Sequence, residues 1–172
     1  MKSIELKCGN FALVDDEDAV FLQKYSWRSY FDGWNWYVRR GTTVNKKVKT
    51  ILLHRAIMGV TDSKILVDHI DHNGLNNQKS NLRLCNHSQN KKNTKGRGSS
   101  KYLGVSLKKT SYNYTTKSGE ERVSKSCRWE ARIQHNKKQI SIGFFDTEIE
   151  AALAYNKIAS IYHGEFANLN KI

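Results

Sequence analysis

The 172-residue chain contains no proline, only three cysteines and no long apolar run. Without proline, the turns must be formed by glycine, asparagine and serine, and proline-rich linkers are excluded. No apolar stretch approaches the roughly 18 residues that a membrane-spanning helix needs. The N-terminal residues also lack the apolar core of a secretory signal. We therefore expect a soluble, cytoplasmic protein with no membrane partner.

The three cysteines, Cys8, Cys85 and Cys127, are far apart in the chain and odd in number. No Cys-x-x-Cys pair is present, so the pattern supports neither a disulfide framework nor a structural zinc knuckle. We expect all three thiols to be reduced and buried.

Acidic residues are few: 16 Asp and Glu residues stand against 29 Lys and Arg residues, and the formal net charge is +13. An excess of this size predicts a polyanionic partner, above all nucleic acid. Residues 91–128 hold 11 of the basic and 2 of the acidic groups, whereas residues 65–90 and 129–172 are each neutral. Most of the charge is therefore concentrated in one segment.

That basic segment opens with a stretch that has the composition of a flexible linker. Folded-looking elements flank it, which marks a domain boundary. A run of charge is usually only a solvated surface, but here we predict that the cations contact DNA phosphates. The residues concerned are Lys91, Lys92, Lys95 and Arg97.

The N-terminal region, residues 1–64, has the pattern of a small mixed α/β arrangement. Hydrophobic spacing predicts two short strands within 4–14, a helix over 16–26, a hairpin across Asp32-Gly33, and a strand that runs into a short helix over 49–58. We expect the aromatic residues of this region to form a core and His54 to have a structural role. This region alone reveals no function.

The segment 65–95 begins as a short apolar strand that delivers Asp68 and His69 to its end. An Asn- and Gly-rich loop, a second strand and a short helix capped by Ser88 follow. A strand–loop–strand–helix unit of this kind can fold back so that Asp68 and His69 face Asn90.

Hydrolysis of a phosphodiester needs a cation that stabilises developing charge and a base that activates water. A carboxylate and an amide oxygen suit Mg²⁺, and Asp68 and Asn90 can supply them. The neutral imidazole of His69 can take a proton from the attacking water near neutral pH. We expect Asn81 to tie the loop down by side-chain hydrogen bonds and so to orient the histidine. Asp71 is interpreted as a loop hydrogen-bonding residue rather than a metal ligand.

These residues resemble the HNH endonuclease motif of intron-associated and phage homing enzymes. The matching residues are Val67-Asp68-His69, Asp71, Asn73-Gly74, Asn76-Asn77, Ser80-Asn81-Leu82-Arg83 and Asn90. The resemblance implies that His69 is the general base and that Asn81 organises the loop. It also implies that Asp68 and Asn90 bind a divalent metal, Mg²⁺ with Mn²⁺ as an alternative ion. The last family position is often His, but Asn is common there in the homing branch.

The pattern changes in residues 96–172. Alternation over 128–134 and 139–143, after a strand that starts near Tyr102, predicts a sheet. A Thr147-x-x-Glu150 capping box predicts a helix that runs to about residue 162. We expect one stripe of this helix to pack on the sheet, formed by Ile149, Ala152, Tyr155, Ala159 and Tyr162. The other face of the sheet is then left polar and basic.

This segment resembles the plant ethylene-response-factor (Apetala-type) DNA-binding domain. The matching stretches are Tyr102-x-Gly104-Val105, Trp129-x-Ala131-x-Ile133, 143–147 and 150–156. The resemblance implies a three-stranded antiparallel sheet that lies in the major groove of DNA. On this chain the reading face becomes Ser106, Lys108, Arg128, Arg132, Gln134, Gln139 and Ser141.

Two departures from the plant pattern limit what can be carried over. Several plant base-contacting Arg and Trp positions are Leu103, Ser106, Gln139 and Ser141 here, so the plant target sequence does not transfer. An insertion over about 109–126 is the second departure. Two interpretations of it stay open, a mobile basic flap on phosphates and a long hairpin loop.

Together these patterns predict an α+β chain in three parts: a mixed region at 1–64, a ββα-metal HNH unit at 65–95, and an Apetala-type sheet packed on one helix at 96–172. We expect a site-specific homing endonuclease, encoded by a phage or mobile element, that nicks double-stranded DNA. A monomer without an obligate protein partner is favoured. The alternative is a non-catalytic sequence-specific DNA-binding regulator. An RNA-binding module is disfavoured because the aromatic stacking motif of common RNA-binding folds is missing.

Overall fold

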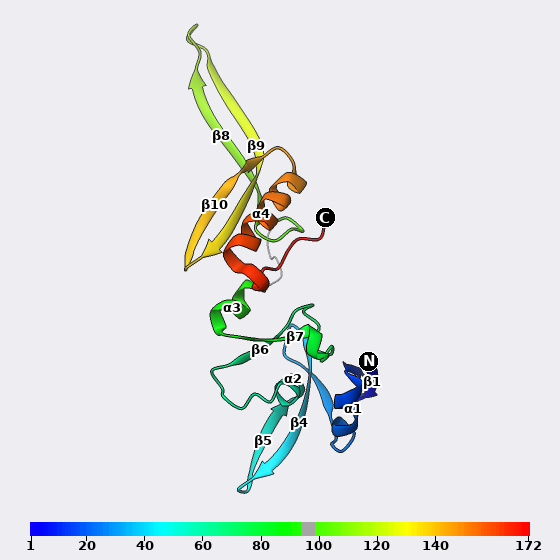
Figure 1. Ribbon diagram of the computed structural model, residues 1–172. Coiled ribbons are helices and arrows are strands. Elements are labelled where there is room, and N and C mark those ends of the chain that lie inside the picture. Colours follow the sequence, from blue (N-terminus) through cyan, green and yellow to red (C-terminus); the bar gives the residue numbers. More distant parts are fainter. Residues whose placement is uncertain (94–98) are drawn as a thin grey trace. The chain divides into compact units, whose positions relative to one another are not determined.

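The computed structural model describes residues 1–93 and 99–172 (Figure 1). The chain divides into two compact units, Met1–Asn90 and Lys91–Ile172, and both contain small antiparallel sheets with few helices. The α+β class predicted from the sequence is therefore confirmed, while the predicted boundaries at residues 64 and 95 stay predictions. Within the described ranges, no helix is both long and apolar enough to cross a membrane.

The first half of unit one follows the predicted order of elements. An antiparallel strand pair and a helix come first: β1 (Lys2–Glu5), β2 (Phe11–Val14) and α1 (Asp16–Leu22). A three-stranded sheet follows and leads directly into a short helix: β3 (Arg28–Phe31), β4 (Trp36–Val44), β5 (Lys47–Leu52) and α2 (Leu53–Ile57). The α1 helix is shorter than predicted and ends four residues before Ser26, the predicted end.

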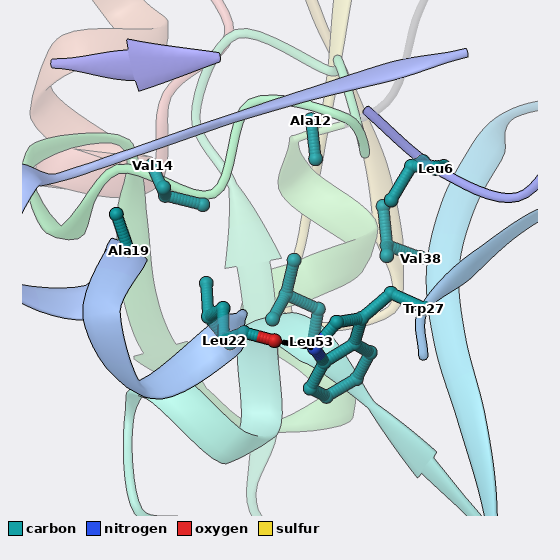
Figure 2. Packing of buried hydrophobic residues seen from close by; sticks show 8 residues of the cluster. All are labelled: Leu6, Ala12, Val14, Ala19, Leu22, Trp27, Val38 and Leu53. Atoms are coloured by element: carbon teal, nitrogen blue, oxygen red, sulfur yellow. Dashed lines mark hydrogen bonds between the residues drawn. The ribbon is translucent and has the colours of Figure 1, made fainter. Parts of the chain in front are cut away.

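A single hydrophobic cluster holds these elements together (Figure 2). Its buried members come from β2, α1, β4, α2 and the connecting segments: Leu6, Ala12, Val14, Ala19, Leu22, Trp27, Val38 and Leu53. Trp27 is 4% exposed, and its indole nitrogen donates a hydrogen bond of 3.1 Å to the carbonyl oxygen of Leu22. A buried indole N–H needs such a partner, and this bond holds the ring against the C-terminal end of α1.

Two hairpin turns show how the chain turns without proline. Asn45 and Lys46 join β4 to β5 with φ angles of 51° and 61°, and Asn136 and Lys137 repeat the arrangement with 48° and 64°. Two successive residues with positive φ match the twist of an antiparallel hairpin, and Asn tolerates this conformation better than most residues.

The remainder of unit one follows the predicted strand–loop–strand–helix order. It consists of β6 (Leu66–His69), a 3₁₀ turn η1 (Lys79–Asn81), β7 (Leu82–Cys85) and the start of α3 (His87–Lys92), whose last two residues belong to unit two. The loop between β6 and β7 is held against the N-terminal sheets. The amide of Asn77 donates to the carbonyl of Leu13 at 2.7 Å, and a Cβ on Gly74 would lie 2.2 Å from the carbonyl oxygen of Trp36.

The predicted cap of α3 is wrong. Ser88 lies inside the helix, and Asn86 precedes it. The amide of Gln89 donates to the Asn86 side chain at 2.9 Å, and the Gln89 side chain accepts from the amide of Asn86 at 2.9 Å. Both Asn and Ser cap helices well, and the reciprocal partner three residues later decides in favour of Asn86.

Unit two is a three-stranded sheet in the order β10-β9-β8, packed on one long helix. Its elements are β8 (Val105–Thr115), β9 (Glu121–His135), β10 (Lys138–Phe145), α4 (Glu148–His163) and a final turn η2 (Gly164–Phe166). The predicted capping box is confirmed: Thr147 accepts from the amide of Glu150 at 3.2 Å, and Glu150 accepts from the amide of Thr147 at 3.1 Å. Gly164 ends the helix with a φ of 56°.

The face of α4 that packs on the sheet differs in part from the predicted stripe. Ile149 and Tyr162 are 50% and 36% exposed, whereas Ala151 and His163 are buried. The buried alanines of α4 allow a close approach of the helix to the sheet, and Tyr155 is buried with them. Such crowding is visible at Gly104, where a Cβ would lie 2.2 Å from the ring of Tyr155.

The prediction that all three cysteines are reduced and buried is only partly right. All three are free, but Cys85 alone is buried. Cys127 lies in the part of β9 that no third strand covers, and Cys8 lies in the turn between β1 and β2. A contact of 2.8 Å with the hydroxyl of Ser29 lowers the pKa of the Cys8 thiol.

Candidate functional site

The β6–β7 pair places Asp68 and Arg83 directly opposite each other. Both Nη2 and Nε of Arg83 contact Oδ2 of Asp68, at 2.8 and 3.0 Å. The two side chains are 12% and 9% exposed. A planar guanidinium that uses two nitrogens on a shielded carboxylate fixes its orientation. Arg83 therefore positions Asp68, a role that the sequence did not assign to it.

His69 follows Asp68 and lies in an almost closed environment, with 6% of its surface exposed. Its Nε2 lies 3.4 Å from Oδ1 of Asn77, and its ring lies 5.8 Å from the ring of Tyr37. Burial lowers the pKa of His69, and this effect exceeds the opposing influence of Asn77 and of the nearby carboxylates. The imidazole is therefore neutral at neutral pH, as a proton acceptor must be.

A second histidine, His54 of α2, packs edge-on against His69. The two ring centroids are 5.0 Å apart and the ring planes meet at 86°. His54 is also 6% exposed, and burial, followed by the charges of His69 and Arg55, lowers its pKa to about 3. Tyr37 contacts both imidazoles, with centroid distances of 6.0 and 5.8 Å. His54 and Tyr37 together limit how far the His69 ring can tilt.

The loop after His69 is held by a local network centred on Asn81. The Asn81 amide nitrogen donates to Asp71 at 2.9 Å and to the carbonyl of Asn76 at 2.8 Å, and its oxygen accepts from the amide of Asp71 at 3.1 Å. Burial would raise the pKa of Asp71, but hydrogen bonds from Asn73, Asn76 and Asn81 outweigh it and lower the pKa. Asp71 is thus an ionised acceptor committed to the loop.

Asn90, the predicted second metal ligand, lies exposed in the first turn of α3. Arg83 contacts Asp68, and Asn77, Tyr37 and His54 contact His69. The described residues hold no cluster of three or more His, Cys, Asp or Glu side chains suited to a metal. The predicted site has one carboxylate and one amide as its protein ligands, so it would not form a cluster of three such side chains.

The chemistry of these two side chains nevertheless fits a hard cation. Mg²⁺ prefers oxygen ligands and usually retains several waters, so one or two protein oxygens suffice. A carboxylate has acceptor capacity on both oxygens, so the contact of Arg83 with Oδ2 of Asp68 is compatible with a further ligand role. The positive charge of Arg83 weakens the attraction for a cation and sharpens the position of the carboxylate.

The predicted DNA-reading residues of unit two share one face of the sheet. Strand register pairs Lys108 with Arg128, Gln139 with Gln134, and Ser141 with Arg132, and the alternation of β9 puts all six on the same side. Of the predicted linker contacts, Lys91 and Lys92 lie in α3, while Lys95 and Arg97 lie outside the described residues.

Sequence reasoning missed a buried acid at the centre of this face. Glu130 is 3% exposed, forms ion pairs with Arg132 at 2.6 Å and Lys108 at 3.7 Å, and accepts a hydrogen bond of 3.0 Å from Ser141. The pairing with Arg132 lowers the pKa of Glu130. One carboxylate thus connects predicted reading residues from all three strands, and its place in the alternating pattern of β9 was the available signal.

Comparison with known proteins adds two similarities. Residues 53–92, which include His54 and the four predicted site residues, match the family described as HNH endonuclease. A protein of Acanthamoeba polyphaga mimivirus, named as an uncharacterized HNH endonuclease, is 34% identical over 169 residues, which cover 95% of this chain and 76% of the viral protein.

The second similarity covers the C-terminal part alone. APETALA2-like protein 2 of rice, from both the indica and japonica subspecies of Oryza sativa, is 41% identical over 76 residues. The match covers 43% of this chain and 14% of the rice protein, so it bears on one domain only. No solved structure matches the chain.

Proposed function

The chain belongs to the HNH endonuclease family, and from this membership and the geometry around His69 we propose that it is a site-specific DNA endonuclease of the homing type. It hydrolyses one phosphodiester bond of double-stranded DNA and so nicks one strand, because one such unit carries one hydrolytic centre. It acts as a monomer inside the cell that holds its DNA target.

One observation carries this proposal: two adjacent, buried residues that are held from opposite sides. Asp68 is fixed by Arg83 across the strand pair, and His69 is enclosed by Asn77, Tyr37 and His54. A neutral imidazole that its neighbours hold in one orientation is suited to take a proton from water, and Asp68 is the fixed carboxylate next to it in the sequence. In this proposal His69 accepts that proton, and Asn81 is the positioning residue that keeps the following loop in place.

Nucleases of this family generally use a divalent metal. Asp68 and Asn90 would hold it, with Mg²⁺ as the expected ion and Mn²⁺ as the alternative. When bound, such a cation polarises the phosphoryl group and stabilises charge on the leaving oxygen.

Target recognition is assigned to unit two. Its polar sheet face would lie in the major groove and read bases through Arg132, Gln134 and Gln139, while Lys108 and Arg128 contact phosphates. Each base that is read well contributes only about 1–3 kcal/mol, so recognition of a long site is spread over many contacts. The partial similarity to the rice protein supports this assignment.

Plasmid cleavage tests the proposal. Supercoiled DNA that carries the sequence flanking the gene of this protein should become open circular when the protein and Mg²⁺ are added. The variant His69→Ala should lose cleavage but retain binding, and His87→Ala, which removes an exposed histidine of α3, serves as the matched control.

A DNA-binding regulator is the second candidate, because unit two has its own core and its own polar face. Wild-type protein that binds the plasmid tightly and specifically, yet leaves it supercoiled with Mg²⁺ or Mn²⁺, would establish the regulator and exclude the nuclease.

A further inference from the structure

The β8–β9 hairpin continues well past the third strand of its sheet (Figure 1). Strand β10 pairs with β9 only between Trp129 and His135, whereas β8 pairs with β9 without interruption to the Thr115–Glu121 pair. We call residues 109–127 the arm. All of its residues are exposed except Thr116 and Ser124, which are half-buried. The predicted insertion is therefore an extension of two paired strands rather than a long loop, and its contact with phosphates stays a prediction.

The two faces of the arm have different chemistry, because side chains alternate along each strand. One face continues the polar reading face directly: after Lys108 and Arg128 come the cross-strand pairs Thr110–Ser126, Tyr112–Ser124 and Tyr114–Arg122. These six arm residues are hydroxyl-bearing except for one cation, and none is acidic. We call this the continuing face.

The opposite face of the arm continues the side of the sheet that packs on the helix. Its cross-strand pairs are Lys109–Cys127, Ser111–Lys125, Asn113–Val123 and Thr115–Glu121. It contains the carboxylate of Glu121 and the 56% exposed side chain of Val123. Only the continuing face is thus polar without acidic groups along its length.

Local contacts stiffen the continuing face. The hydroxyls of Thr110 and Ser126 are joined across the strands at 3.3 Å, and the rings of Tyr112 and Tyr114 lie 6.1 Å apart. Arg122 forms an ion pair of 2.8 Å with Glu120 in the turn, with 61% and 60% of the two side chains exposed. An exposed pair of this kind contributes little to stability, so Arg122 can exchange Glu120 for a phosphate at low cost.

We propose that the arm is a two-stranded ribbon that extends the DNA-contacting face along the duplex, with the continuing face against the DNA. This inference rests on the proposed function, in which unit two binds DNA. A two-stranded ribbon fits the width of the major groove, and hydroxyl groups and Arg are typical contacts to sugar and phosphate. Both faces of the arm are exposed, and an isolated two-stranded hairpin is only marginally stable in water. Contact with DNA would therefore stabilise the arm.

The length of the arm sets the size of the effect. Tyr114 lies six positions after Lys108 along β8, and at about 3.3 Å per residue the two are about 20 Å apart. That distance corresponds to about six base pairs at about 3.4 Å per base pair. The DNA segment protected by the protein should therefore extend about six base pairs beyond the part covered by the three-stranded sheet.

Footprinting of the full chain on its mapped target tests the arm as a whole. In an arm-shortened variant, Asn-Gly replaces residues 110–126, which keeps the Lys109–Cys127 pair next to a turn suited to hairpins. We expect hydroxyl-radical protection to retreat by about six base pairs at one end. An unchanged footprint with intact binding would overturn the arm proposal and leave the proposed function standing. No specific binding by the wild type would overturn the proposed function itself.

Two exposed cations on opposite faces test which face is used. Arg122→Gln should reduce the slope of log K against log salt concentration by about 0.9, the value for one phosphate contact in duplex DNA. Lys125→Gln removes the same charge from the opposite face and should change the slope less. Equal effects would show that the arm attracts DNA only through its net charge and would overturn the assignment of the face. Both side chains are exposed, so we expect neither substitution to change the folding of the chain.

Discussion

The candidate site and the polar sheet face hold their ion pairs in opposite ways. In the site, the paired side chains of Arg83 and Asp68 are only 12% and 9% exposed. On the sheet face, Arg128 and Asp146 are paired at 3.2 Å with 51% and 82% of their side chains exposed. A buried pair keeps a carboxylate in one place, whereas an exposed pair can be exchanged for a ligand. The first arrangement suits chemistry that needs a fixed position, and the second suits reversible binding.

Removal of the charge at Asp68 should have the largest effect. Asp68→Asn keeps the size of the side chain and an oxygen for Arg83 but loses the carboxylate. We expect cleavage with Mg²⁺ to fall by about 10²- to 10⁴-fold, since a metal typically contributes several kcal/mol to phosphoryl activation. Single-turnover cleavage over a range of Mg²⁺ concentrations measures this.

Binding of the target by Asp68→Asn should stay within about twofold of wild type, because the residue lies outside the sheet face. Cleavage at the wild-type rate would remove Asp68 from the site and, with it, the proposed ligand pair.

Truncation of the two arginines tests the comparison through stability. Arg83→Ala removes the cation that faces a buried carboxylate and should lower the free energy of unfolding by about 3–5 kcal/mol. Arg128→Ala breaks an exposed pair and should change it by less than about 1 kcal/mol. Urea unfolding followed by circular dichroism gives both values. Similar losses for the two variants would mean that burial does not distinguish the pairs.

The two buried histidines make the stability of the folded chain depend on pH below about 6.5. His54 has a pKa of about 3 in the folded protein, well below the usual 6.5, so the unfolded chain binds a proton that the folded chain does not. The contribution of neutral His54 to the free energy of unfolding is therefore complete above about pH 6.5. Below that pH, the free energy of unfolding should fall by about 1.4 kcal/mol per pH unit. The lowered pKa of His69 acts in the same direction.

His54→Phe removes one of these titrating groups and keeps a ring against His69. Urea unfolding at pH 7 and pH 5 should show a clearly smaller loss of stability in the variant than in the wild type. The same slope in both proteins would place the acid sensitivity elsewhere in the chain.

The parts of the site that could be predicted are those encoded by neighbouring residues. The side chains of Asp71 and Asn73 form turns by accepting from the backbone amides two residues later, and such local chemistry can be predicted from the sequence. The sheet of unit two could also be predicted, because strands alternate with period two and the capping box of α4 is local. The α+β class followed from these patterns.

The parts that could not be predicted depend on contacts between distant segments. His54 meets His69 only because α2 packs beside the β6–β7 pair, and neither residue indicates this by itself. Glu130 looked like one polar residue in an alternating strand, but strand register surrounds it with partners from two other strands. The arm was ambiguous because Ser, Thr, Asn and Tyr fit both strands and loops.

Glu130 is the exception to the comparison and the subject of the smallest predicted effect. Its side chain is 4% exposed, although its partners Arg132 and Lys108 are 34% and 42% exposed. A buried acid on a face that is proposed to bind DNA would repel phosphate, so affinity alone does not explain it. By holding Arg132, Lys108 and Ser141 from three strands, it would fix the geometry in which they meet the bases.

Glu130→Gln should therefore leave total DNA affinity within about threefold of wild type, since one repulsive charge is lost along with one positioning contact. Discrimination between the target and single-base variants should fall by about tenfold, the lower range for one well-made base contact. Competition binding measures both quantities, and a variant that discriminates as well as wild type would show that the carboxylate stabilises the sheet without shaping recognition.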